Sequence, residues 1–362
     1  MSWAEERARF PVFERHAYLN AGTFGPLARG TIAAVDDVRR FEAEHGRAGR
    51  PFFDAMLERR ERVRALVAAQ LGVDPGLVAL TESTSQGVQI VVLGLGIGPG
   101  DEVLTTDVEH FGLAGPLAAS RATLEIVPVR GVPPEDLFEL LLGRVSPHTR
   151  LIALSAVSWL DGSIFPWREL REATGVPILV DGAQSVGAIP VDPQGADFYT
   201  VSGQKWLCGP DLTGALYVAE PTAIATRLLA HSGVESYDVG AGTWVPKEGA
   251  RRFDPTYGAA SSLAGFEAAL TDLPDGRFDR AAGLAGRCRS LLLGRGHDVV
   301  TAPGQGTLVS WRHPGDTALA AAALYERGVV IRELPGTGLL RASVGWWNDE
   351  SDLERLVEAL DD

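Results

Sequence analysis

Two ionisable residues, an aspartate and a lysine, each follow a short apolar run. Asp181 comes directly after the run Ile178–Val180, and Lys205 follows the run Phe198–Val201 by four residues. Short apolar runs of this kind predict buried parallel strands, and open α/β sheets bind ligands at the carboxyl ends of such strands. An amine and a carboxylate at one sheet edge are what pyridoxal phosphate (PLP) chemistry requires. The amine forms a Schiff base and the anion lies beside the pyridine nitrogen.

Each polar residue in this stretch has a role in that chemistry. Asp181 would keep the ring nitrogen protonated through a charge-assisted hydrogen bond. Lys205 would hold the cofactor and then move the substrate's Cα proton. Gln184 is placed to bond the phenolic oxygen, while Ser202 and Gln204 could donate to the phosphate. Taken singly, a strand-ending aspartate is often a helix cap and a lone lysine is usually a surface charge.

Together these residues resemble a known signature. With Trp206, Gly209 and Pro210 after the lysine, the stretch is similar to the PLP-lysine motif of class V aminotransferases, the cysteine desulfurase-like group. This resemblance implies a fold-type I α/β architecture, with a mostly parallel sheet between helices and a small α+β C-terminal domain. It implies a large PLP-binding domain over residues 16–258, with residues 1–15 and 259–362 forming the small domain.

Composition agrees with an enzyme of two domains. The 362 residues are 45% hydrophobic and carry a net charge of −14, which argues against nucleic-acid or anionic-membrane partners. Two cysteines provide no disulfide framework, and neither a signal peptide nor an apolar run of membrane-spanning length is visible. We therefore expect a cytoplasmic protein that acts on a small molecule.

A predicted helix start supplies the phosphate site. The strand Val78–Leu80 is followed by T-E-S-T-S-Q-G and the helix Val88–Leu95. Hydroxyl residues at a helix start are usually caps, but free backbone N–H groups there also bind phosphate. The resemblance assigns that role to Thr84 and Ser85.

Three further regions match family positions that line the active site. The segment Y-L-N-A-G contains Asn20 and Ala21, which the resemblance places at the substrate pocket. The motif D-V-E-H contains His110, which would stack on the PLP ring above Ala183. The C-terminal signature contains Arg341, whose planar guanidinium would bind the substrate α-carboxylate through two hydrogen bonds.

Other positions depart from the best-known cysteine desulfurases. Trp159 stands where those enzymes carry Asn, and in this it resembles the branch of the family that contains epimerases and C–S lyases. The resemblance makes Trp159 a further substrate-pocket residue. Gln204 replaces a His and cannot act as a proton shuttle near neutral pH. Thr256 or Tyr257 lies in the loop that reaches the neighbour's phosphate in family dimers, so the resemblance implies a homodimer with its active site at the subunit interface.

A missing cysteine bears on the reaction. Desulfurases carry a nucleophilic Cys before the carboxylate-binding arginine, but E-L-P-G-T-G-L-L separates Arg332 from Arg341 here. Cys208 is expected to be a buried structural thiol. We therefore predict Cα deprotonation of an amino acid, with C–S lyase-type β-elimination ahead of transamination and epimerisation. A non-catalytic PLP-holding homologue is the alternative from another functional class. The sequence does not determine the side chain of the substrate, although Arg332 is a candidate for binding a second carboxylate.

The supporting elements are predicted from periodicity. Helices are expected near residues 30–44, 54–71, 221–229, 262–273 and 279–293, and further strands at 123–129 and 151–155. Residues 230–251 are rich in glycine and turn residues. From residue 259 the pattern predicts helix, helix, strands, helix, strands and helix.

Overall fold

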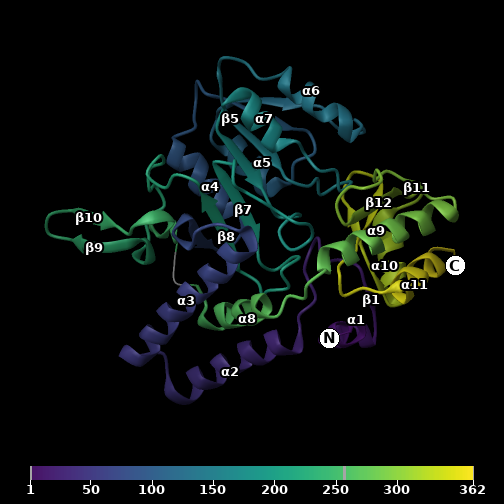
Figure 1. Ribbon diagram of the computed structural model, residues 1–362, viewed down its shortest axis with the longest axis horizontal. Helices are drawn as coiled ribbons and strands as arrows, with labels where there is room; N and C mark the ends of the chain where they lie inside the picture. Colours follow the sequence, from purple (N-terminus) through teal and green to yellow (C-terminus); the bar gives the residue numbers. More distant parts are fainter. Residues whose placement is uncertain (1, 256–257, 362) are drawn as a thin grey trace.

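The computed structural model describes residues 2–255 and 258–361, and it is built around a seven-stranded sheet (Figure 1). The strand order is β2-β8-β7-β6-β5-β3-β4, and β8 alone runs antiparallel to the other six. Their bounds are β2 Val78–Thr81, β3 Glu102–Thr106, β4 Thr123–Val127, β5 Thr149–Ser155, β6 Ile178–Asp181, β7 Phe198–Ser202 and β8 Gly214–Val218. The predicted parallel sheet and its two central strands are confirmed.

Helices cover both faces of this sheet because the strand side chains are apolar on both sides. Leu104 and Leu154 point into a core shared with α3, α6, α7 and α8, whereas Val103 and Ala153 point into one shared with α4 and α5. This alternation follows from the two-residue period of a strand. The helices are α2 Arg29–His45, α3 Arg50–Leu71, α4 Thr84–Leu95, α5 Phe111–Ala119, α6 Leu137–Leu142, α7 Trp167–Thr174 and α8 Ala260–Thr271.

The C-terminal part forms a second layer of sheet and helices beside the first (Figure 1). A four-stranded antiparallel sheet has the order β11-β12-β15-β14, and a short strand β1 pairs with β13. The N-terminal elements associated with this part are α1 Trp3–Ala8 and β1 Ala17–Tyr18. Its own elements are α9 Arg277–Gly294, β11 Asp298–Val299, β12 Leu308–Arg312, α10 Thr317–Glu326, β13 Val329–Val330, β14 Arg332–Leu334, β15 Leu339–Ser343 and α11 Glu350–Asp361. The predicted element order after residue 259 is confirmed.

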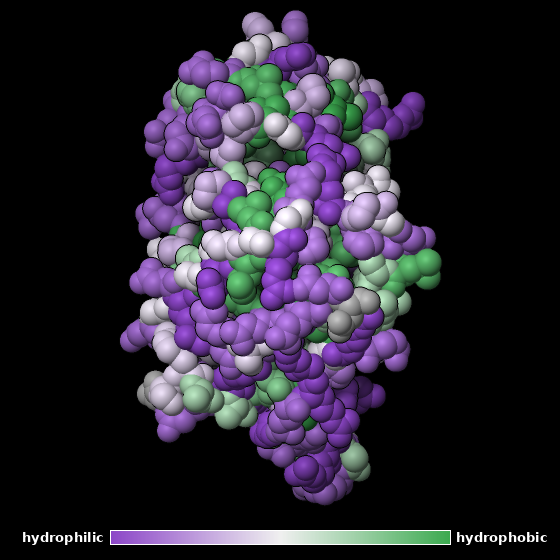
Figure 2. Space-filling model, turned by 90° about the vertical axis from the view of Figure 1, so that its right-hand side faces the viewer, coloured by the Kyte–Doolittle hydropathy of each residue, from purple (hydrophilic) through white to green (hydrophobic). Residues whose placement is uncertain are grey.

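Contacts at the two ends of the large domain bear on its predicted limits. Helix α8 packs against α2 and α3, and β1 hydrogen-bonds with β13 of the C-terminal part. The division at residues 16–258 stays a prediction. On the face made largely by the C-terminal part, hydrophilic side chains predominate and hydrophobic ones occur in separate patches (Figure 2). No helix among the described residues is long and apolar enough to span a bilayer.

The predicted helix over residues 221–229 is wrong. That segment is irregular because its backbone bonds to a neighbouring helix: the amide of Ala225 donates to the carbonyl of Gly94 in α4 at 3.0 Å. Burial of Ile224 against the same helix holds it there. The next segment, predicted only as turn-rich, forms a hairpin of β9 Val234–Asp238 and β10 Thr243–Pro246 that projects from the large domain (Figure 1).

Candidate active site

The aspartate lies where the sequence predicted, at the carboxyl end of a central strand. Asp181 is the last residue of β6 and is 3% exposed. Its Oδ1 accepts hydrogen bonds from the amide of Ala183 and the hydroxyl of Thr200, both at 3.0 Å. Within the described chain, no donor contacts Oδ2. One carboxylate oxygen is therefore fixed and the other is available to a ligand.

The lysine lies in the turn after the neighbouring strand. Desolvation within the cleft lowers the pKa of Lys205 to about 8, with the negative charge of Asp181 opposing that shift and Arg341 adding to it. A larger fraction of neutral amine makes the lysine a better nucleophile near neutral pH. The N-terminal segment closes over this turn, and a Cβ added at Gly25 would lie 2.0 Å from the Lys205 carbonyl oxygen.

Lys205 lines a cleft of about 200 Å³ between the sheet edge and the C-terminal part. Its walls come from segments far apart in the sequence, which the fold brings together. The lining residues are Gly22, Thr23, Phe24, His110, Trp159, Gln184, Lys205, Arg332, Leu334 and Arg341. Asp181 lies at the base of the same sheet edge, on the strand that precedes Gln184.

Arg341 enters the cleft from β15 and is 2% exposed. Its Nη1 donates to the carbonyl of Trp159 at 2.7 Å and its Nη2 to the hydroxyl of Thr23 at 3.4 Å, while Nε is buried without a partner. Burial, and then the nearby charge of Arg332, lower the pKa of Arg341 to about 9. No described carboxylate pairs with either arginine, so this end of the cleft favours an anionic group.

Gln184 is oriented by two hydrogen bonds. Its Nε2 donates to the carbonyl of Gly22 at 2.9 Å, and its Oε1 accepts from Nε1 of Trp206 at 2.9 Å. An amide nitrogen carries two hydrogens, so one stays available for a phenolic oxygen. Trp206, which the sequence analysis used only as part of the signature, thus sets the direction of this amide.

His110 caps helix α5 rather than ending a strand. Its Nδ1 accepts from the amide of Gly112 at 3.0 Å, and its ring meets the Trp159 ring edge-on at 5.3 Å. Burial and then the charge of Lys205 lower the pKa of His110. A neutral ring can lie against a cationic heteroaromatic ligand without charge repulsion, so the stacking role stays a prediction consistent with this geometry.

Helix α4 begins four residues earlier than predicted, so the hydroxyl residues lie in its first turn. Ser83 caps the helix by accepting from the amide of Gln86 at 3.2 Å, and Thr84 and Ser85 are the first two helical residues. The side chain of Ser85 lies close to the backbone of Gly112, at the start of α5. The free N–H groups of α4 therefore point toward the carboxyl edge of the sheet, as a phosphate site requires.

The remaining predicted residues lie as follows. Asn20 bridges to Ser343 and its buried Oδ1 has no partner, whereas Ala21 is fully buried in a core and does not line the cleft. Ser202 is the buried last residue of β7. Gln204 lines a neighbouring pocket beside α2, and its buried Oε1 has no partner. Thr256 and Tyr257 lie outside the described residues.

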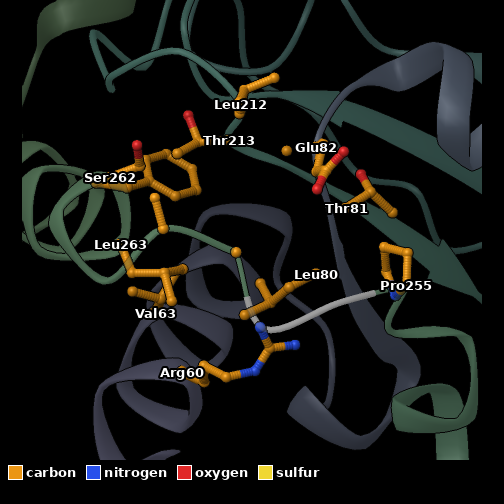
Figure 3. A pocket seen from close by; sticks show the side chains of 14 residues that line it. Arg60, Val63, Leu80, Thr81, Glu82, Leu212, Thr213, Pro255, Ser262 and Leu263 are labelled. Carbon is orange, nitrogen blue, oxygen red and sulfur yellow. The ribbon is translucent and has the colours of Figure 1, made fainter. Parts of the chain in front are cut away.

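A separate pocket near the start of α4 contains none of the lysine, aspartate or arginine side chains above (Figure 3). Residues from α3, β2, β8 and α8 line it, together with Glu82, Thr213 and Pro255 from the connecting segments. Its volume of about 20 Å³ suits a water molecule and excludes a cofactor.

One partly buried carboxyl was not predicted from the sequence. Glu109 precedes His110 in the D-V-E-H motif, where only the histidine is predicted to have a role. In the structure Glu109 accepts hydrogen bonds from Ser155, which pairs in register with Asp181. The signal in the sequence was an acidic residue three positions beyond Thr106, the last residue of a buried strand.

Comparison with known proteins places this geometry in a family. The model of the aminotransferase class-V family matches residues 28–294, and the chain belongs to that family. It is 28% identical to isopenicillin N epimerase of Streptomyces clavuligerus over 99% of this chain and 98% of that protein. It is 30% identical to a probable cysteine desulfurase of Pseudomonas aeruginosa over 98% of this chain and 96% of that protein.

Solved structures give the same result. A mutant of C-DES with glycine covalently linked to its PLP cofactor has a TM-score of 0.90 and 26% identity, covering 98% of this chain and 99% of the other. The cystine C–S lyase C-DES in complex with cysteine persulfide has a TM-score of 0.89 at the same identity. The fold-type I architecture is confirmed, and the chain is a PLP-dependent enzyme.

The described residues fit that cofactor. The fit rests on an amine with a lowered pKa, a carboxylate oxygen that lacks a donor, and a helix start with free N–H groups at one sheet edge. The orphaned Nε of Arg341 and Nε1 of Trp159 lie on the substrate side of the cleft.

Proposed function

We propose that the protein is a lyase that eliminates a sulfur leaving group from Cβ of an amino acid, with cystine-like disulfides as the substrate class. The supporting observation is that this anion-binding cleft contains two arginines and no cysteine. The connection between β14 and β15 is only four residues long, so it carries no loop that could deliver a thiol. The similarity to the cystine C–S lyase C-DES extends over nearly the whole chain.

The side chains divide the work between binding and proton transfer. When bound, PLP provides the electron sink that stabilises a carbanion at the substrate's Cα. Asp181 would hold the ring nitrogen of the cofactor through the carboxylate oxygen that accepts no donor from the described chain, and Arg341 would bind the α-carboxylate. Lys205 Nζ removes the Cα proton, after which the Cβ–S bond breaks and the sulfur leaves with the electron pair. Arg332, at the mouth of the same cleft, would bind a second carboxylate such as that of cystine.

Both cysteines are unsuited to persulfide chemistry. Burial raises the pKa of Cys288 to about 12 and raises that of Cys208 further. A thiolate is the nucleophilic form, and a raised pKa suppresses it. Cys208 also lies behind the Lys205 turn, in the core with Trp206 and Trp347.

A product assay with purified holoenzyme tests the reaction type. Cystine, cysteine and simple amino acids are incubated without a co-substrate, and keto acid, ammonia and persulfide are quantified. Keto acid plus ammonia supports elimination. Pyridoxamine phosphate that an added keto acid discharges would instead show a transaminase, and exchange of the Cα hydrogen with inversion and no keto acid would show an epimerase.

The proposal includes a cytoplasmic homodimer. Exposed apolar side chains occur on three segments: Phe24 in the cleft wall is 49% exposed, Phe111 next to His110 is 81% exposed, and Leu212 at the separate small pocket is 64% exposed. A second subunit that covers them would remove this apolar surface from water. Light scattering should give twice the monomer mass of 38.5 kDa, and a monomer at micromolar concentration would contradict this part.

A further inference from the structure

The partly buried carboxyl of Glu109 has no part in the chemistry above, yet it occupies the same sheet edge. Its Oε1 accepts from the hydroxyl of Thr106 at 2.8 Å. Its Oε2 accepts from the amide of Ser155 at 3.1 Å and the hydroxyl of Ser155 at 2.5 Å. Three donors from β3 and β5 therefore converge on one side chain.

These contacts place Glu109 beside the cofactor-binding aspartate. Ser155 is the register partner of Asp181 on the adjacent parallel strand, and the amide of Ala156 donates to the Asp181 carbonyl at 2.9 Å. Glu109 is also bonded in the chain to His110, the predicted stacking residue. One carboxyl thus joins the ends of two strands to the turn that carries the histidine.

No described cation forms an ion pair with Glu109. Burial is the main cause that raises its pKa to about 7, with Asp181 adding to the shift and the Ser155 and Thr106 donors opposing it. The charged or titratable groups that line the cleft are His110 at the start of α5, Lys205 in the turn after β7, Arg332 on β14 and Arg341 on β15.

We propose that Glu109 is a positioning residue that supplies a second negative charge behind Asp181 and thereby helps to keep the ring nitrogen of bound PLP protonated, while it holds the His110 turn against β5. This inference rests on the proposed function, in which Asp181 holds that nitrogen. The binding of the cationic ring next to Asp181 favours ionised Glu109, because opposite charges favour each other's charged forms.

The test compares Glu109→Gln with a matched control. Glutamine is nearly isosteric, and the Thr106 and Ser155 hydroxyls can rotate to bond it, so the substitution removes mainly the charge. The control is Glu102→Gln on the opposite end of β3, because Glu102 also accepts from two hydroxyls, those of Ser146 and Thr149 at 2.7 and 2.6 Å. Glu109→Asp keeps the charge and should restore part of the effect.

The readouts are PLP affinity of the apo protein and the pH midpoint of the visible absorption of bound PLP. For Glu109→Gln we expect affinity to fall about tenfold and the midpoint to fall by about one pH unit, as one lost interaction of roughly 1.4 kcal/mol would give. Glu102→Gln should leave both unchanged. An unchanged midpoint and affinity in Glu109→Gln would overturn the proposal.

Apo-protein stability separates this result from misfolding. Because the folded-state pKa of Glu109 is raised from 4.5 to about 7, its ionisation disfavours folding progressively from pH 4.5 to 7 and fully above pH 7. Apo Glu109→Gln should therefore gain stability over wild type at pH 8 but not at pH 4.5. Borohydride labelling of wild type at a lysine other than Lys205 would refute the proposed site itself, independently of the Glu109 result.

Discussion

Arg332 and Arg341 are register partners on the antiparallel strands β14 and β15, and both line the cleft. Like charges directly opposite each other in a sheet destabilise it by roughly 0.2–1 kcal/mol. No described carboxylate compensates this pair. The arrangement is consistent with an anion that binds between or beside the two guanidinium groups. Substituting each arginine singly can therefore distinguish their contributions to substrate binding.

Arg341→Lys should raise KM for amino acids by about tenfold to a hundredfold, since a point charge cannot reproduce bidentate carboxylate binding worth roughly 1.5–3 kcal/mol. Steady-state kinetics measures the change. Arg332→Lys is the matched control, and it should affect cystine more than amino acids with one carboxylate. Equal KM effects of both substitutions on every substrate would contradict the separate roles.

Reduction with borohydride should attach the cofactor covalently to Lys205, and peptide mass spectrometry locates the label. Lys205→Ala should keep its fold by circular dichroism while losing more than about 10²–10⁴-fold in turnover, because both attachment and proton transfer are lost. Lys247, on the hairpin side of the large domain, provides a lysine control whose substitution should leave the labelling intact. A label found on Lys247 would remove Lys205 from its role.

Asp181→Asn should still bind PLP but lose most of its activity, because a neutral amide cannot keep the ring nitrogen protonated. The loss of a charged hydrogen bond should weaken PLP binding by roughly 1.5–3 kcal/mol. Thr200→Val provides a milder control, since it removes one of the two donors to Oδ1, at 3.0 Å, together with an acceptor for the Gly182 amide, and leaves the carboxylate in place. Near wild-type turnover in Asp181→Asn would exclude the electron-sink assignment.

Attachment of PLP to the apo protein should depend on pH through the amine of Lys205. Because its pKa is lowered from 10.5 to about 8, the rate should rise with pH up to about 8 and level off above that value. Stopped-flow absorbance measures the rate. Below the midpoint each pH unit should change the rate about tenfold, as one pKa unit is about 1.4 kcal/mol. A midpoint near 10 would show an ordinary exposed lysine.

Simultaneous substitution of Cys208 and Cys288 by alanine should leave kcat for cystine unchanged, since no thiol takes part in the proposed chemistry. Both side chains are buried, so a lower melting temperature is expected from the loss of packing. A protein persulfide on Cys208 after exposure to cysteine, together with lost activity in the variant, would show that the protein is a cysteine desulfurase instead.

The sheet and the positions of Asp181 and Lys205 could be predicted because they depend on local apolar runs and on strand ends. The irregular segment around Ala225 could not, since its conformation depends on a backbone bond to Gly94 in a distant helix. Propensity alone favours a helix there, and tertiary contact overrides it.

Prediction of the candidate site was limited in the same way, by contacts between residues that are distant in the sequence. Residues that belong to motifs were found, whereas the hydrogen bonds that orient them were not, because the partners are remote in sequence. Gln184 could be named from its spacing to Asp181, but its bond with Trp206 required the fold. Glu109 belongs to the D-V-E-H motif, but its role could not be predicted, since its contact with Ser155 is a tertiary property.

The bond between Arg341 and Thr23 joins residues 318 positions apart, and β1 pairs with β13 across a similar span. The wall of the cleft that contains Arg341 therefore cannot form until nearly the whole chain has been synthesised, whereas the strands on either side of Asp181 and Lys205 are synthesised earlier. Long-range pairings of this kind form slowly. If the proposed roles hold, a newly made molecule would be able to bind PLP before the substrate-binding wall of the cleft has formed. Cofactor binding and substrate binding would then arise at different times during folding.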